Sequence, residues 1–189
     1  MLHFATEDEL ESWLRARGVD LSRWGREAAK TVGDLWAEIR KGESVMQEKP
    51  PLRSVQAVRV VVRRGNTVLI EARQAFDGGR RRERNRPPSE KMHPGESYTD
   101  AALHCLREEL SVDDRDVVLH EHTYRRRVWE GNPASYPGLN TRYTFHIIDA
   151  TVQGLPREDF CTTEQAIGPG EPIGVHYWEW RKSILRRKL

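Results

Sequence analysis

Residues 90–112 of the chain read EKMHPGESYTDAALHCLREELSV. Ser97 and Asp100 are spaced as the two members of a capping box, in which each side chain binds a backbone amide at a helix start. The leucines that follow recur at intervals of three and four, as they do on one face of a helix: Leu103, Leu106 and Leu110. The stretch therefore predicts a helix over residues 97–110 that packs through its leucines.

The other side of this helix carries polar side chains. At about 100° per residue, four of them share that side: His104, Cys105, Glu108 and Glu109. Hard divalent ions such as Mg²⁺ prefer carboxylate oxygens, and often use one or two of them together with substrate phosphates. The polar side is therefore a candidate site. The alternative is a solvated amphipathic helix with adjacent glutamates.

The segments around the helix are predicted to be strands and loops. Residues 58–70 alternate in apolar character around a turn at Gly65-Asn66, which predicts a hairpin. Further strands are expected at 117–119, 124–129 and 143–152. Residues 153–174 are rich in glycine and proline and are expected to be loops, with a short helix near Glu164. A short basic helix is expected from Arg181 onward.

Residues 1–48 are predicted to be a small helical extension. Capping boxes begin at Thr6 and at Thr31, and an apolar stripe at helical spacing follows each. Pro50-Pro51 mark a hinge, because proline cannot continue a helix and disfavours helix in the residue before it. Helices this short are marginal in water alone. We therefore expect the stripes to be buried against each other, against the rest of the chain or against a protein partner. The last two are favoured, because two short helices make only a small core.

Residues 90–112 resemble the Nudix box, whose pattern is Gly, five residues, Glu, seven residues, Arg-Glu, an aliphatic, any residue, Glu-Glu, any residue, Gly and an aliphatic. The alignment needs no gap, and the matching residues are Glu96, Leu106, Glu108, Glu109 and Val112. The resemblance extends over residues 52–182. It implies an α/β fold, the Nudix-type α/β/α sandwich with a mixed sheet, preceded by the helical extension of residues 1–48.

Four positions depart from the family pattern: Glu90, His104, Cys105 and Ser111. The resemblance makes Glu108 and Glu109 the catalytic and metal-binding residues if the chain is active, with Mg²⁺ as the cofactor. Cys105, however, replaces a metal-binding glutamate, and a thiol is a poor partner for Mg²⁺. The imidazole beside it cannot copy the bidentate contact of the family's arginine. We therefore expect hydrolysis to be lost or weak, although Glu121 or Glu164 could supply another carboxylate.

Residues 77–88 contain five arginines and are predicted to be an exposed loop. The arginines that could bind substrate phosphates are Arg82, Arg84 and Arg86 in this segment, and Arg125 and Arg127 on one face of a later strand. The alternative for these side chains is a solvated surface. Aromatic residues that could stack on bases, or pack beneath their loop, are Trp129, Tyr136 and Tyr143.

Three functions are compatible with these features. The first is a Nudix-like protein that binds nucleotide or RNA phosphates, needs no cofactor and hydrolyses weakly or not at all. The second is an active Mg²⁺-dependent hydrolase of nucleoside diphosphate derivatives. The third is a scaffold that docks a protein partner through its N-terminal helices.

Composition limits the class of protein further. The chain has 189 residues with 31 Lys and Arg against 29 Asp and Glu, and no apolar run approaches the roughly 18 to 20 residues that cross a bilayer. Two cysteines do not make a disulfide framework. The first ten residues lack the pattern of a secretory signal. We therefore expect a protein that is not in a membrane and is intracellular, cytoplasmic or organellar.

Overall fold

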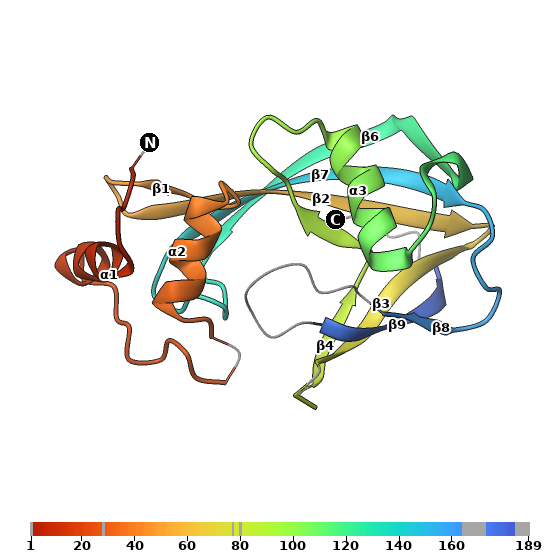
Figure 1. The fold of residues 1–189 in the computed structure, drawn as a ribbon. Coiled ribbons are helices and arrows are strands. Elements are labelled where there is room, and N and C mark those ends of the chain that lie inside the picture. The colour runs from red at the N-terminus through yellow and green to blue at the C-terminus, as the bar shows by residue number, and fades with distance from the viewer. Residues whose placement is uncertain (1, 28, 77, 80, 164–172, 184–189) are drawn as a thin grey trace. The chain divides into compact units, whose positions relative to one another are not determined.

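The computed structural model describes residues 2–27, 29–76, 78–79, 81–163 and 173–183. The described residues have a mixed α/β architecture with a large sheet and few helices (Figure 1). The elements in chain order are α1 (Glu7–Ala16), α2 (Val32–Arg40), β1 (Val45–Gln47), β2 (Leu52–Arg64), β3 (Thr67–Phe76), β4 (Arg81–Arg86), β5 (Ser89–Lys91), α3 (Tyr98–Leu110), the 3-10 turn η1 (Asp114–Asp116), β6 (Val117–Gly131), β7 (Thr141–Val152), β8 (Phe160–Thr162) and β9 (Ile173–Lys182).

The strands follow the order β6-β7-β2-β3-β9-β8, with β1 and β5 paired to β2 and β4 paired to β3. The predicted hairpin is present: β2 and β3 pair antiparallel with Arg64 opposite Thr67. The two strands expected at 117–119 and 124–129 are one continuous strand, β6. No described helix is long and apolar enough to cross a membrane.

The chain divides into two compact units. The helical unit comprises Met1–Ala57, Lys91–Glu96 and Arg126–Phe145, and the box unit comprises Val58–Glu90, Ser97–Arg125 and His146–Leu189. The strands β2, β6 and β7 each contribute residues to both units. In the first of these strands, β2, the division falls after Ala57.

Both N-terminal helices begin where the sequence predicts. Thr6 accepts a hydrogen bond from the Glu9 amide at 3.2 Å. Thr31 accepts from the Asp34 amide at 3.0 Å, while the Asp34 carboxylate accepts from the Thr31 amide at 2.8 Å, which completes a capping box. Such caps satisfy amides that the first helical turn leaves without partners. Local sequence thus determines where these helices start.

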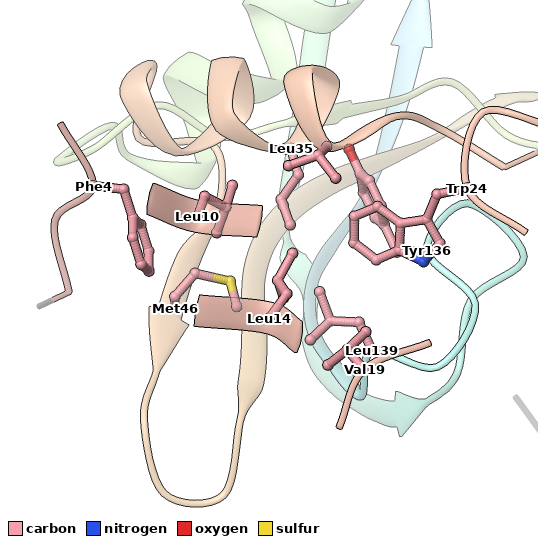
Figure 2. Close-up of a cluster of buried hydrophobic side chains, with 10 residues drawn as sticks. Phe4, Leu10, Leu14, Val19, Trp24, Leu35, Met46, Tyr136 and Leu139 are labelled. Carbon is pink, nitrogen blue, oxygen red and sulfur yellow. The ribbon is translucent and has the colours of Figure 1, made fainter. Parts of the chain in front are cut away.

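The apolar faces of α1 and α2 are buried inside the helical unit. Figure 2 shows Leu10 and Leu14 of α1 pointing toward Leu35 of α2. Residues from far along the chain complete this core, since Trp24 packs on Tyr136 with ring centroids 5.0 Å apart. The stripes that the sequence predicts to be covered are therefore covered by the chain itself, and these residues need no partner protein to bury them.

Replacing Leu35 by Ala is expected to destabilise the helical unit by about 2–5 kcal/mol, because a fully buried leucine loses its contacts and leaves a cavity. Urea unfolding measures this change in free energy. Leu21→Ala removes a partly buried leucine from the edge of the same core and should have less than half the effect. Equal effects of the two changes would contradict the central position of Leu35.

Candidate functional site

The helix α3 forms as predicted, but its buried face differs from the predicted one. Ser97 caps the helix by accepting from the Asp100 amide at 3.1 Å. The residues on the buried face are Ala101, Ala102, Cys105, Leu106, Glu109 and Leu110. Leu103 is only half-buried, and Glu108 is exposed. The prediction that Cys105 and Glu109 lie on the side opposite the leucines is therefore wrong, because both lie on the buried face with Leu106.

The C-terminal end of α3 is held by a left-handed residue and by β8. Ser111, where the family pattern has glycine, has a φ of 56°, in the region that ends many helices. The hydroxyl of Thr162 donates to the Glu109 carbonyl at 2.5 Å, and the Trp178 indole donates to that hydroxyl at 2.8 Å. Glu109 is thus positioned by β8 and β9 as well as by its own helix.

Glu109 is a buried carboxyl group, with 4% of its surface exposed. Its Oε2 atom has no hydrogen-bond partner among the described residues. Burial raises the pKa of Glu109 well above its ordinary value, and the negative charges of Glu71 and Glu90 raise it further. The carboxyl group therefore keeps its proton to higher pH than an exposed glutamate does.

Glu71 of β3 is buried beside this helix but has two internal partners. Its Oε1 lies 2.6 Å from Nδ1 of His176 on β9, and its Oε2 accepts from Nε of Arg84 on β4 at 2.7 Å. Burial alone would raise the pKa of Glu71, but the hydrogen bond with His176 and the charge of Arg84 lower it below its ordinary value. The Glu71 carboxylate is therefore ionised and already neutralised by the protein.

Cys105 is fully buried at the position where the family pattern has glutamate. Burial raises the pKa of its thiol, and the charges of Glu109, Glu90 and Glu108 raise it further. The thiol is therefore neither a nucleophile nor a ligand suited to Mg²⁺. One turn apart on the same helix, His104 and Glu108 form a half-exposed pair at 3.0 Å.

These residues do not fit a resident divalent metal ion. Among the described residues, no group of three or more His, Cys, Asp or Glu side chains is arranged to hold a metal. Glu71 is the carboxylate whose charge raises the pKa of Glu109 most, and it already binds Arg84 and His176. Glu121 is exposed on β6, and Glu164 lies outside the described residues. No chemical step through Mg²⁺ follows from this arrangement.

The prediction that residues 77–88 form a loop is wrong for Arg81–Arg86, which form the strand β4. In this strand Arg82 donates to the Gln74 amide oxygen and Arg84 binds Glu71. Arg86 is half-buried, and its Nε has no partner among the described residues. Arg80 lies outside the described residues. The strand forms because β3 offers a free edge, a long-range pairing that local composition does not reveal.

The two later arginines, Arg125 and Arg127, belong to different units. Arg125 belongs to the box unit and donates to Asp149 at 3.2 Å, so its charge is paired internally. Arg127 is exposed and belongs to the helical unit. Base stacking on Tyr136 is contradicted, because its ring is fully buried in the helical core. Trp129, in contrast, is 46% exposed and contacts Tyr143 at 5.8 Å between ring centroids.

Sequence reasoning missed the strand β9 and therefore His176. Residues up to 174 were expected to be loops and Arg181 to begin a helix, whereas β9 runs over Ile173–Lys182 beside β3. The basic residues 186–188 lie outside the described residues. A signal was present, since His176, Trp178 and Trp180 alternate with other side chains as in a strand.

Comparison with known proteins gives structural neighbours only. The sequence matches no protein-family model and no curated protein. A binary complex of C. elegans Ap4A hydrolase has 15% identity and a TM-score of 0.37, covering 67% of this chain and 79% of that chain. A second structure of C. elegans Ap4A hydrolase has 18% identity and a TM-score of 0.35, covering 68% and 80%. A Nudix hydrolase from Nitrosomonas europaea has 16% identity and a TM-score of 0.36, covering 66% and 70%. Two of these three structures are of an Ap4A hydrolase, and one is of a Nudix hydrolase.

Proposed function

We propose that this chain is a Nudix-like protein that binds nucleotide or RNA phosphates and hydrolyses them weakly or not at all. The observation that carries the proposal is the burial of Cys105 and Glu109 on α3. A buried thiol replaces a metal-binding carboxylate, and the adjacent Glu109 is a buried carboxyl group with a raised pKa. Metal-assisted hydrolysis needs open coordination by ionised ligands, which this arrangement does not supply.

Positive charge in the box unit supports phosphate binding. The strand β4 carries four arginines and one glutamate. Arg59 of β2 adds a further guanidinium, and its pKa is lowered by burial and by the charge of Arg84. Burial is the larger cause, and the contribution of Arg84 indicates that the two guanidinium charges lie near each other. A phosphate group is suited to such a region, because it accepts bidentate hydrogen bonds from arginine.

The arginines that best fit this role are Arg82 and Arg86. Arg82 is exposed and binds a neutral amide oxygen, and Arg86 has an Nε without a partner among the described residues. Arg84 is not a suitable probe of binding, because its removal would leave Glu71 buried without its guanidinium. The binding test therefore uses only the first two residues.

The double change Arg82→Ala and Arg86→Ala is expected to weaken binding of a fluorescent oligouridylate or of ADP by about tenfold or more, because a charge-assisted hydrogen bond contributes about 1.5–3 kcal/mol. The slope of log affinity against log salt for the oligouridylate should become shallower by about 1.4, since two fewer phosphates are neutralised. Fluorescence anisotropy and calorimetry measure these quantities at several salt concentrations.

Arg115→Ala is the matched control for charge. Arg115 is an exposed arginine of the same unit, bound to Asp113 on the surface, so its loss should leave affinity within about twofold. If the double variant and the control bind equally well, the arginines of β4 are solvated surface and the proposal fails.

A second function has one observation in its favour. Carboxyl groups with strongly shifted pKa values cluster at functional sites, and Glu109 beside Glu71 and Glu90 is such a group. This observation favours a Mg²⁺-dependent hydrolase of nucleoside diphosphate derivatives whose substrate brings the metal. Turnover of ADP-ribose by the wild type, dependent on Mg²⁺ and abolished by Glu109→Gln, would establish it.

A further inference from the structure

The helical unit contains a cavity of about 560 Å³ whose lining does not include Cys105, Glu108 or Glu109. All of its lining residues belong to this unit. They come from the segment before α1, from the end of α2 and the loop after it, from β1 and β2, from the turn at 92–94 and from β6 and β7. Cavities of about 300–1,000 Å³ with a few polar groups are typical of small-molecule sites. The volume therefore suits an organic ligand larger than a simple ion.

The walls of this cavity are mainly apolar, and at one end two of its segments approach each other closely. Ile39, Val45 and Val55 line it from three different elements. At one end, Gly42 follows α2 with a φ of 75°, and a Cβ there would lie 2.2 Å from the Pro94 ring. Only glycine permits this approach, so the end of α2 is fitted tightly against the turn that forms part of the wall.

Among the described residues that line the cavity, one cation has no described counter-ion. Arg142 of β7 donates from Nε to Glu130 at 2.6 Å, and Glu43 accepts from Lys91 at 2.9 Å. Arg126 of β6 also lines the cavity, and no hydrogen bond, ion pair or ring contact to a described residue engages it. The surplus charge beside the apolar walls is therefore positive.

We propose that this cavity binds a small organic anion whose oxyanion head pairs with Arg126 and whose apolar body lies against Ile39, Val45 and Val55. The head is a carboxylate or a phosphate monoester, since both accept hydrogen bonds from a guanidinium in the same geometry. Apolar burial supplies affinity, and the single unpaired cation selects the charge of the ligand. This site is independent of the function proposed for the box unit.

The probe is 8-anilinonaphthalene-1-sulfonate, an aromatic monoanion whose fluorescence rises in apolar surroundings. Arg126→Gln is expected to weaken its binding by about tenfold, which corresponds to about 1.4 kcal/mol. Arg127→Gln removes the same charge from the next residue, whose side chain alternates to the other face of β6, and should leave the affinity unchanged. Equal affinities of the two variants would overturn the proposal.

Filling the cavity tests its location separately. Ser54 lines it from β2, opposite Val45 in the strand ladder, so Ser54→Phe should abolish binding of the probe while circular dichroism shows a folded chain. Octanoate and AMP then compete with the probe on the wild type. Displacement by octanoate identifies a carboxylate ligand and displacement by AMP a phosphate monoester, whereas displacement by neither at millimolar concentration overturns the proposal. If Ser54→Phe does not fold, the comparison of Arg126→Gln with Arg127→Gln decides.

Discussion

Replacing Glu38 by Gln is expected to destabilise the protein by about 3–5 kcal/mol, because it leaves a buried guanidinium without its counter-ion. Arg53 is 1% exposed, and its Nη2 donates to Glu38 Oε2 at 2.6 Å. The same carboxylate binds Lys91 at 2.6 Å and Lys30 at 2.8 Å, and it accepts from the Ser44 hydroxyl at 2.8 Å. Urea unfolding at neutral pH measures the loss.

The control for this change is a carboxylate in an exposed pair. Glu11 binds Arg15 one turn away on α1, and the exposed fractions of the two side chains are 37% and 63%. Glu11→Gln should therefore change the free energy of unfolding by less than about 1 kcal/mol. An effect of Glu38→Gln as small as that of Glu11→Gln would show that the buried network contributes no stability.

The contribution of Glu38 should also depend on pH. Burial alone would raise its pKa, but the positive charges of Lys91, Arg53 and Lys30 outweigh burial and hold the pKa well below the ordinary 4.5. A carboxyl group with a lowered folded pKa contributes stability that is complete above its unfolded pKa and is lost as the pH falls toward the folded one. The difference in unfolding free energy between the wild type and Glu38→Gln should therefore shrink below about pH 4.5.

Replacing Cys105 by Glu is expected to destabilise the metal-free protein by about 3 kcal/mol or more beyond Cys105→Gln, which adds similar volume without charge. The new carboxylate would lie beside Glu109, Glu90 and Glu71, where negative charge already raises the pKa of Glu109. Its folded pKa would also be raised, so the penalty is greatest at neutral pH and is relieved as the pH falls. Thermal unfolding in chelator-treated buffer measures the difference.

The effect of Mg²⁺ on stability tests whether Cys105→Glu creates a metal site or only destabilises the protein. A cation that binds only the folded state raises its stability, so millimolar Mg²⁺ should recover much of the loss in Cys105→Glu and leave the wild type unchanged. The double change His104→Arg and Cys105→Glu should then gain hydrolysis of ADP-ribose over a weak or inactive wild type. A wild type that already turns over efficiently with Mg²⁺ and loses this activity in Glu109→Gln would contradict the proposed function.

The starts of the helices were predictable from the sequence because their signals act within a single turn. Thr6, Thr31 and Ser97 each cap a helix by accepting from an amide three residues ahead. The hairpin of β2 and β3 was predictable for a similar reason, since its two strands are joined by the turn at Gly65-Asn66. The box residues also lie on one helix, so their spacing alone predicted that Cys105 and Glu109 are neighbours one turn apart.

Tertiary structure alone decided which of these side chains are buried and what they bind. Glu71 meets His176 across 105 residues of sequence, and it does so because β3 pairs with β9, a strand whose alternation was obscured by the glycine-rich segment before it. From the sequence, Arg84 was predicted to bind a substrate phosphate. In the structure β4 pairs with β3, and Arg84 binds the Glu71 carboxylate instead. Charge pairing and burial depend on which distant segments become neighbours, and periodicity within one segment does not carry that information.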